Sequence, residues 1–413
     1  MQDTSSTTFR YDPFSPDAMH DPQSFYPTLR EHHPAYFIPE YDAYAITRYA
    51  DVWGAFMDAK NFSESEGQLF SRNQLLVHHR NNPPEPQLDP VAMFNFLDPP
   101  VHGDFRRTMA GPFLQGNVKK LEPQITQMVR ERLAVLLARG QFDLNGDFGS
   151  YISVGSAALI MGLPLPDTGR IIDLVNGMVA RSPDRPGVTP EGIIARNELM
   201  EFLRGAIAQR RRGQGPESVL IDALINAEFI GRPLTDDEIA VDLLGILVGG
   251  TETIPKVFAG GLLELAKRPD QLAEIRADLS ANTVPAFEEM LRYCAPAQWF
   301  GRTAKAPCEV AGVTLEPGQR VILLIAAANR DPREFDDPDA FIWNRKARRM
   351  LSFGVGPHFC IGIHLARLEG QIMLREFLSA VDEFTIEPEA GDWSISEFQV
   401  GWVKLPVRIG RVS

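Results

Sequence analysis

The sequence predicts a mainly α-helical protein that carries several small, mostly antiparallel β-sheets. Apolar residues recur at helical spacing through much of residues 101–300 and again over 360–380, whereas strand-like runs are confined to about 35–50, 305–326 and 384–409. Strands and helices do not alternate regularly, which disfavours a doubly wound α/β fold. The 413 residues, 44% of them hydrophobic, supply a large core, and we expect a single domain over 1–413.

Composition excludes several classes of protein. The net charge of −13 argues against nucleic acid as the main partner. Three cysteines, Cys294, Cys308 and Cys360, give no disulfide framework and suit a reducing compartment. The polar, proline-bearing N-terminus has no apolar run near the ~20 residues that span a bilayer. We therefore expect a soluble, cytoplasmic protein without a membrane anchor, and a monomer.

The N-terminal hundred residues predict two short strands, a helix and a long loop. Runs at 35–38 and 43–47 flank a turn that begins at Pro39, and residues 51–60 have a helical pattern. Residues 72–100 are rich in proline and asparagine and are long for a structureless loop, which indicates function or mobility.

Helices are expected at 119–138, 171–179 and 190–212, the last two joined by residues 180–188. A capping box, Thr235 to Glu238, opens a longer helix that extends toward Lys267. Its middle holds Gly249-Gly-Thr-Glu-Thr253 and then Pro255. Two glycines and a proline in a helix interior destabilise it, so we expect one distorted turn beside an acid and an alcohol.

Residues 353–362, Phe-Gly-Val-Gly-Pro-His-Phe-Cys-Ile-Gly, place Cys360 directly before another helical sequence. Unpaired N–H groups and the positive dipole end of a helix favour a thiolate there, and such a shielded thiolate is suited to bind a metal permanently. The alternative is a buried structural cysteine beside a glycine turn.

This segment resembles the haem-binding loop of the cytochrome P450 monooxygenases, with Phe353, Gly356, His358, Cys360 and Gly362 at the motif positions. Four further segments resemble family motifs in the same order, beginning at Asp98, Gly249, Glu289 and Gly301, and the likeness covers about residues 10–410. The chain is most similar in style to soluble bacterial members of the camphor-hydroxylase type. The resemblance implies the triangular, mainly α P450 prism and a haem b (iron protoporphyrin IX) whose iron is bound by Cys360.

The resemblance also implies roles for individual residues. The catalytic pair that organises proton delivery to bound dioxygen would be Glu252 and Thr253. A network of Glu289, Arg292 and Arg345 would be structural. The family more often has alanine at position 249, and Pro255 is unusual, which leaves the shape of that groove open. Haem would be bound by His102, Arg106, Gly250, Arg302, Phe353, His358, Cys360, Gly362 and Ala366.

Substrate-facing positions implied by the resemblance are mostly apolar, which suits a small-to-medium hydrophobic molecule such as a terpenoid, an aromatic or a steroid. Gln298 and Gln399 are possible polar anchors. Phe94 and Phe96 have an equally plausible role as aromatic anchors of their loop. The expected substrate-binding residues are Phe94, Phe96, Val248, Gly249, Trp299, Phe300, Phe398 and Val400.

Electrons must come from a partner, because no flavin or iron–sulfur motif is present and an iron–sulfur cluster normally takes four thiolates. The resemblance implies a 2Fe–2S ferredoxin with its NAD(P)H-dependent reductase. A basic patch for it, or else merely dispersed charges, would comprise Arg106, Arg107, Lys119, Lys120, Arg345, Lys346, Arg348 and Arg349. Alternatives to a hydroxylating or epoxidising monooxygenase are a peroxide-dependent peroxygenase and a haem-thiolate binding or sensing protein; a cysteine hydrolase is disfavoured.

Overall fold

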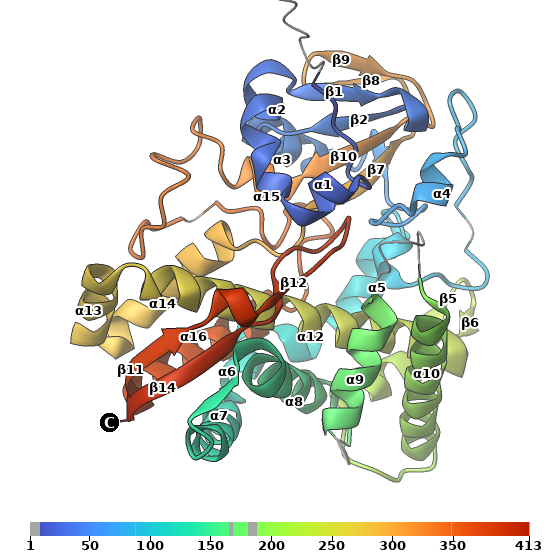
Figure 1. Ribbon diagram of the computed structural model, residues 1–413. Coiled ribbons are helices and arrows are strands. Elements are labelled where there is room, and N and C mark those ends of the chain that lie inside the picture. The colour runs from blue at the N-terminus through green and yellow to red at the C-terminus, as the bar shows by residue number, and fades with distance from the viewer. Residues whose placement is uncertain (1–8, 87, 165–167, 181–187, 348, 413) are drawn as a thin grey trace, which may run out of the picture.

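The computed structural model describes residues 9–86, 88–164, 168–180, 188–347 and 349–412. A helical body fills the lower half of Figure 1, and a β-rich region built from the N-terminal residues and residues 299–324 lies above it. Helix α12 (Asp236–Ala266) crosses the middle of the molecule between the two. The predicted class, mainly α with small sheets, is confirmed.

Most of the helices belong to the body around α12. The longer ones include α7 (Glu122–Leu137), α8 (Ser150–Met161), α10 (Pro190–Arg211), α14 (Leu279–Tyr293) and α16 (Ile363–Ala380). The others are α1 (Pro16–His20), α2 (Tyr26–His32), α3 (Tyr49–Met57), α4 (Arg72–Leu75), α5 (Val101–Met109), α6 (Gln115–Lys119), α9 (Thr168–Val179), α11 (Val219–Ile225), α13 (Pro269–Ala277) and α15 (Ile325–Ala328).

The main sheet has the strand order β1-β2-β10-β7-β3, from β1 (Ala35–Ile38), β2 (Ala43–Ile46), β10 (Arg320–Leu324), β7 (Trp299–Ala304) and β3 (Phe62–Ser63). Strands β1 and β2 form the expected hairpin, and β10 runs parallel to β2, pairing Val321 with Tyr44. The segment 308–315 is a separate hairpin of β8 (Cys308–Val310) and β9 (Val313–Leu315). Strand β7 was not predicted from the sequence.

The C-terminal sheet has the order β11-β14-β4, formed by β11 (Val381–Ile386), β14 (Pro406–Val412) and β4 (Gln141–Asp143). Two short antiparallel pairs complete the β structure of the described residues: β12 (Asp392–Trp393) with β13 (Trp402–Lys404), and β5 (Glu228–Phe229) with β6 (Arg232–Pro233). The loop between β12 and β13, residues 394–401, reaches back to the main sheet through a bridge between Ala297 and Gln399.

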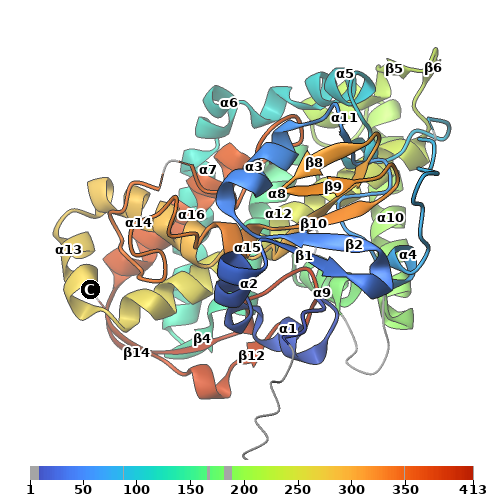
Figure 2. The same cartoon turned by 90° about the horizontal axis from the view of Figure 1, so that it is seen from above.

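Two groups of buried apolar side chains hold the chain together. The main core lies around α12, α8, α14 and α16, and the second core lies under the main sheet, where Tyr26, Tyr41 and Trp299 are nearly inaccessible. Figure 2 shows the main sheet stacked over one side of the helical body. Strand β7 borders both groups, since Trp299 belongs to the second core and Ala304 to the main core.

Helix α12 begins at the predicted capping box: Thr235 Oγ1 accepts from the Glu238 N–H, and the Glu238 carboxylate accepts from the Thr235 N–H. The helix is continuous over 31 residues and keeps Pro255 in its interior, so the expected distortion is not a break. A close approach accommodates it: a Cβ on Gly149 would lie 2.9 Å from the Cα of Pro255. Helices α9 and α10 match the predicted pair, and most of the joint between them, residues 181–187, lies outside the described residues.

Candidate active site

The cysteine loop is a tight turn before α16. The Cys360 N–H donates to the Phe353 carbonyl at 2.8 Å, which closes the loop on itself. Gly354 and Gly356 have positive φ angles of 65° and 81°. At Gly356 a side chain is also sterically excluded, because a Cβ would lie 2.5 Å from the Phe56 carbonyl oxygen on α3. The glycines therefore fix where the thiol is presented, as glycine's freedom at positive φ allows.

Burial raises the pKa of the Cys360 thiol, and three groups oppose that effect: the Gly362 N–H, Arg106 and Arg367. A bound cation holds such a thiol deprotonated regardless of burial. Among the described residues no cluster of three or more His, Cys, Asp or Glu side chains is arranged to bind a metal ion. Cys360 as a single donor fits a metal ion whose other ligands belong mostly to a bound organic group.

Helix α5 contacts the cysteine loop through two side chains one turn apart. Arg106 Nη2 donates to the Phe359 carbonyl at 2.6 Å, and its guanidinium lies 4.4 Å from the centre of the Phe359 ring. The His102 ring stacks on the His358 ring with centroids 3.7 Å apart. Burial is the main reason that the pKa of His102 is lowered to about 4 and that of His358 to about 2, so both rings are neutral.

Arg302 on β7 lies beside His358 together with a carboxylate that the sequence did not single out. Glu64 Oε1 lies 2.5 Å from Arg302 Nη2, and Glu64 Oε2 lies 3.0 Å from His358 Nδ1 without hydrogen-bond geometry. Burial raises the pKa of Glu64 to about 7, although Arg302 acts in the opposite direction. A small cavity lined by Glu64, Arg302 and His358 lies at this point.

Helix α12 presents one partly open face in its middle, although most of its residues there are buried. Val248, Gly249 and Thr253 keep accessible surface, and a Cβ on Gly249 would meet no atom within 4 Å. The Thr253 hydroxyl donates to the Gly249 carbonyl at 3.3 Å. Gly250 lies closer to the body, where a Cβ would meet the Ala157 Cβ at 3.7 Å.

Glu252 lies on a different, buried side of α12. Its carboxylate Oε2 is 2.5 Å from Lys256 Nζ, one turn further along the helix. Lys256 Nζ also donates to Gln399 Oε1 at 3.0 Å, so the expected polar anchor Gln399 is bonded to α12. The acid and the alcohol of the expected catalytic pair are thus adjacent in sequence but point to different surroundings.

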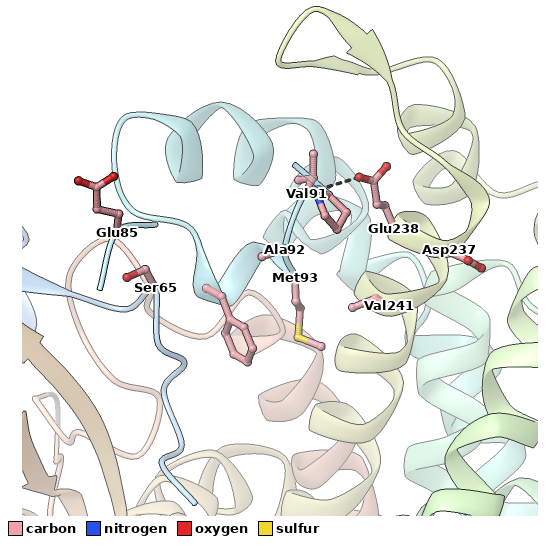
Figure 3. Close-up of a pocket in the computed structure, with 10 residues that line it drawn as sticks. Ser65, Glu85, Val91, Ala92, Met93, Asp237, Glu238 and Val241 are labelled. Atoms are coloured by element: carbon pink, nitrogen blue, oxygen red, sulfur yellow. Dashed lines mark hydrogen bonds between the residues drawn. The ribbon is translucent and has the colours of Figure 1, made fainter. Parts of the chain in front are cut away.

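The loop before α5 is attached to the N-terminal half of α12 by two carboxylates. The Val91 N–H donates to Glu238 Oε1 at 2.6 Å, and the Phe94 N–H donates to Asp242 Oδ1 at 2.8 Å. A pocket of about 500 Å³ opens between this loop and α12, with Met93, Val91 and Val241 in its lining (Figure 3). Phe96 lines that pocket, whereas Phe94 is buried and its ring lies 6.4 Å from His102.

The residues expected around the substrate on β7 divide between two sides of the strand. The Phe300 ring lies 5.6 Å from the Phe398 ring, and Val400 is buried beside them with its N–H bonded to Pro296. Trp299 does not face the substrate region as we expected, because neighbouring residues of a strand point to opposite faces and Phe300 takes the other one. Its side chain packs in the second core near Phe14 and donates to the Glu397 carbonyl, away from Phe300.

Gln298 is likewise not available as a polar anchor. Its amide Nε2 donates to the Ser396 carbonyl at 2.8 Å and its Oε1 accepts from the Tyr26 hydroxyl at 3.2 Å, both in buried surroundings. Its hydrogen bonds therefore hold the 394–401 loop to the second core.

The Glu289, Arg292 and Arg345 side chains meet in one buried network. Arg292 contacts both Glu289 oxygens at 2.7 and 2.8 Å and donates to the Asn329, Pro338 and Ala340 carbonyls. Arg345 Nε lies 3.1 Å from Glu289 Oε1. Arg345 is therefore enclosed, and our expectation that it belongs to the basic patch at the surface was wrong.

The other members of that patch lie partly at the surface. Arg107, Lys119, Lys120, Lys346 and Arg349 are exposed, Arg106 is half-buried, and Arg348 lies outside the described residues. Arg107 pairs with Asp104, and Arg349 with Glu334 at 3.5 Å. In the described part of the chain, no helix is long and apolar enough to cross a membrane.

Sequence reasoning missed Glu64, Lys256 and Asp242. The sequence could have indicated the Lys256–Glu252 pair, since Lys256 follows Glu252 by four residues on a predicted helix and such pairs face each other. Asp242 had a weaker signal, a lone carboxylate on the apolar side of the same helix. Glu64 had none, because only the folded chain brings it to Arg302, 238 residues away, as their numbers show.

Comparison with known proteins gives one consistent result. The family model described as Cytochrome P450 matches residues 191–410. The "Putative cytochrome P450 123" of Mycobacterium tuberculosis is 30% identical over 401 residues, 96% of each chain. The "Beta-dihydromenaquinone-9 omega-hydroxylase" of the same species is 30% identical over 408 residues, 97% of this chain and 78% of the relative. The structure of cytochrome P450 CYP109Q5 from Chondromyces apiculatus superposes with a TM-score of 0.81 at 28% identity, covering 98% of both chains.

Proposed function

The chain belongs to the cytochrome P450 family and is a P450 monooxygenase, and from this premise we propose that it hydroxylates or epoxidises a compact hydrophobic substrate with electrons from a 2Fe–2S ferredoxin. The family implies haem, dioxygen, a substrate and a redox partner.

The residues of this chain fit a haem. In the described residues His102 Nε2 and both ring nitrogens of His358 are buried without a hydrogen-bond partner. Such groups are costly unless a ligand satisfies them. Together with Arg302 and Arg106 they supply donors and positive charge for the two propionates of haem b. Cys360 would bind the iron, and Phe353, Gly362, Ala366 and Gly250 would border the porphyrin.

A bound haem would supply the dioxygen-activating chemistry, and the Cys360 thiolate would bind its iron and donate electron density to it. The side chains of α12 deal with protons. Thr253 Oγ1, held by its bond to the Gly249 carbonyl on the open face, is proposed to hold and pass a proton. Glu252 is proposed to resupply Thr253 through water from its buried side.

The substrate would lie against apolar side chains contributed by four segments: β7, the 394–401 loop, α12 and the loop before α5. Phe300 and Phe398 support this proposal through their mutual ring contact, and Val248 and Gly249 through their accessibility on α12. Phe96 and Val400 complete the proposed set, and the buried Phe94 supports the loop that carries Phe96. No basic side chain belongs to it, which favours a neutral terpenoid, aromatic or steroid over an anionic fatty acid. The relative named a beta-dihydromenaquinone-9 omega-hydroxylase supports a hydrophobic substrate.

Binding of geraniol, naphthalene and testosterone, one from each proposed class, can be followed by the shift of the Soret band from low to high spin. A shift with at least one class, and none with palmitate, is the expected result. A shift with palmitate alone contradicts the proposed substrate class.

A ferredoxin is proposed to dock where Lys119, Lys120, Arg107 and Lys346 are exposed, behind the cysteine loop. An acidic partner suits these charges despite the chain's net charge of −13. Reduction by the ferredoxin should slow as ionic strength rises, because salt screens exposed charges. A salt-independent rate would contradict this docking surface.

The single observation that carries the proposal is the closed loop that presents Cys360 beside unsatisfied histidine nitrogens and two arginines. Replacement of Cys360 by serine should abolish the thiolate-type absorption band of the reduced carbon-monoxide complex. An unchanged band refutes Cys360 as the ligand. Thr253→Ala should keep substrate binding but divert electrons to hydrogen peroxide; unchanged product per NAD(P)H would remove Thr253 from proton delivery.

A further inference from the structure

Lys256 makes an unusually complete set of contacts for a lysine in the interior. It is 5% exposed, and its ammonium group donates to Glu252 Oε2 at 2.5 Å, to the Glu252 carbonyl at 3.1 Å and to Gln399 Oε1 at 3.0 Å. Three acceptors use all three N–H groups of the side chain. The site is therefore complete without water or any further ligand.

The chain makes room for this lysine. Gly401 has a φ of 136°, and a Cβ there would lie 2.8 Å from the Cβ of Lys256. The 394–401 loop is thus shaped around the lysine stem as well as bonded to its ammonium group. A buried ion pair adds little net stability compared with apolar residues of the same volume, so its presence suggests a role other than stabilisation.

The pair controls where the Glu252 carboxylate lies. Adjacent residues of an α-helix are about 100° apart around the axis, so Glu252 and Thr253 face different directions. Thr253 remains partly accessible on the face that carries Gly249, whereas Glu252 is 5% exposed and bonded to Lys256. For Glu252 to resupply Thr253 with a proton, the carboxylate must turn away from Lys256.

Gln399 connects this pair to the proposed substrate. It lies between Phe398 and Val400 in the sequence and pairs with Ala297 next to the main sheet. A ligand that displaces Phe398 therefore acts on Gln399, and through one hydrogen bond on Lys256. The carboxylate, the ammonium group and the amide form a continuous chain of contacts from α12 to the substrate loop.

We propose that Lys256 is the positioning residue of the proton-delivery carboxylate. Lys256 keeps Glu252 away from the open face of α12 until the hydrogen bond between Lys256 and Gln399 breaks and the ammonium group can move. This inference rests on the proton role proposed above for Glu252 and Thr253. Lys256 itself does not touch substrate or cofactor. It acts through Glu252, so its effect must vanish when Glu252 can no longer carry a proton.

The test uses the haem-loaded enzyme, a plant-type 2Fe–2S ferredoxin and its NADPH-dependent reductase, with dioxygen as the only acceptor. The readouts are the rate of NADPH oxidation and its solvent deuterium isotope effect. Glu252→Gln should slow oxidation at least about tenfold, in line with the loss of a general acid. Lys256→Met should speed it about threefold, equivalent to a barrier lower by about 0.7 kcal/mol, and reduce the isotope effect.

The decisive comparison is the double variant. In the Glu252→Gln background, Lys256→Met should have no further effect, whereas an equal effect in both backgrounds overturns the positioning role. Lys256→Arg, which keeps the charge, should restore a wild-type isotope effect. The matched control is Lys267→Met on the same helix, where the exposed lysine pairs with Glu264 and no change is expected.

Two arms cover the remaining outcomes. Gln399→Leu removes one of the three acceptors that fix the Lys256 ammonium group, so the ammonium group can move and release Glu252. It should reproduce part of the Lys256→Met effect, which keeps the inference testable if Lys256→Met does not fold. If Glu252→Gln slows NADPH oxidation but neither Lys256→Met nor Gln399→Leu changes it, the positioning role of Lys256 is overturned and the proton role of Glu252 stands. No effect of Glu252→Gln overturns its proposed proton role and the positioning role with it.

Discussion

Glu64 and Arg302 form a buried ion pair, with 2.5 Å between Oε1 and Nη2, at the place where the haem propionates are proposed to bind. Gln68 donates to the other oxygen of Glu64, and the Glu64 N–H donates to Asp98. Because burial raises the pKa of Glu64 to about 7, the protein keeps a negative charge of its own above that pH, beside the arginine and the histidine, His358, that fit an anionic ligand.

Neutralising this carboxylate should strengthen haem binding. In Glu64→Gln the propionates no longer compete with a buried like charge for Arg302, and the affinity of the apoprotein for haem should rise about tenfold, equivalent to about 1.4 kcal/mol. Titration of the apoprotein with haem at pH 8.5, where Glu64 is ionised, measures this directly when it is followed at the Soret band.

The matched control for that change is Glu66→Gln, which affects a second carboxylate paired at 2.5 Å with a buried arginine, Arg320. It should destabilise the sheet without raising the affinity for haem. Equal affinities for Glu64→Gln and the wild type would show that Glu64 does not oppose the propionates.

Asp242 should make the stability of the loop before α5 depend on pH. Burial raises its pKa to about 8, whereas an unfolded aspartate titrates near about 4. The folded state therefore keeps this proton longer than the unfolded state, and stability should fall as pH rises from about 4 to about 8. Asp242→Asn, which keeps an acceptor for the Phe94 N–H, should lose this component.

The measurement is the melting temperature of wild type and Asp242→Asn at pH 5, 7 and 9. The difference between them should grow with pH in favour of the variant. A difference that stays constant, or that shrinks with pH, contradicts a proton on Asp242 in the folded state.

The network around Glu289 should be strongly coupled to folding. Arg292→Leu leaves Glu289 charged and buried without its main partner, so we expect a loss of about 3–5 kcal/mol in the free energy of unfolding. Arg204→Ala is the contrasting change, because Arg204 and Asp237 form an exposed pair whose loss should cost about 1 kcal/mol or less. Denaturant unfolding compares the two. Similar small losses would show that the network does not support the fold.

Gly149 should be intolerant of a side chain because of Pro255. A Cβ there would lie 2.9 Å from the proline Cα and 3.2 Å from the Leu144 carbonyl oxygen. Gly149→Ala should destabilise the protein by about 1–3 kcal/mol, as overpacking does. In the Pro255→Gly background the contact with the Cβ of residue 255 is removed and the contact with its Cα remains, so only part of the loss should be relieved. Additive losses in the double variant would show that the two positions do not contact each other.

The sequence predicted what depends on local pattern. The capping box at Thr235, the hairpin at residues 35–46 and the cysteine loop all appear where the pattern put them. It could not reveal β7, whose six residues include a glycine and a buried arginine that interrupt any apolar alternation. The side on which Trp299 packs depends on register, which a short strand does not specify alone. Glu64 and Arg302 meet only through tertiary packing.

Because β7 is a strand of the main sheet and also carries Arg302, retention of the proposed haem should depend on the stability of that sheet. Strand β7 anchors Trp299 in the second core and, three residues later, places Arg302 beside Glu64 on the opposite side. Fraying of the sheet would withdraw the arginine that is proposed to hold a haem propionate. The rate at which the loaded enzyme loses haem should then depend on how readily the strands of residues 35–46 and 299–324 separate. Loss of the Soret band on storage should therefore occur at the same rate as proteolytic cleavage of that sheet.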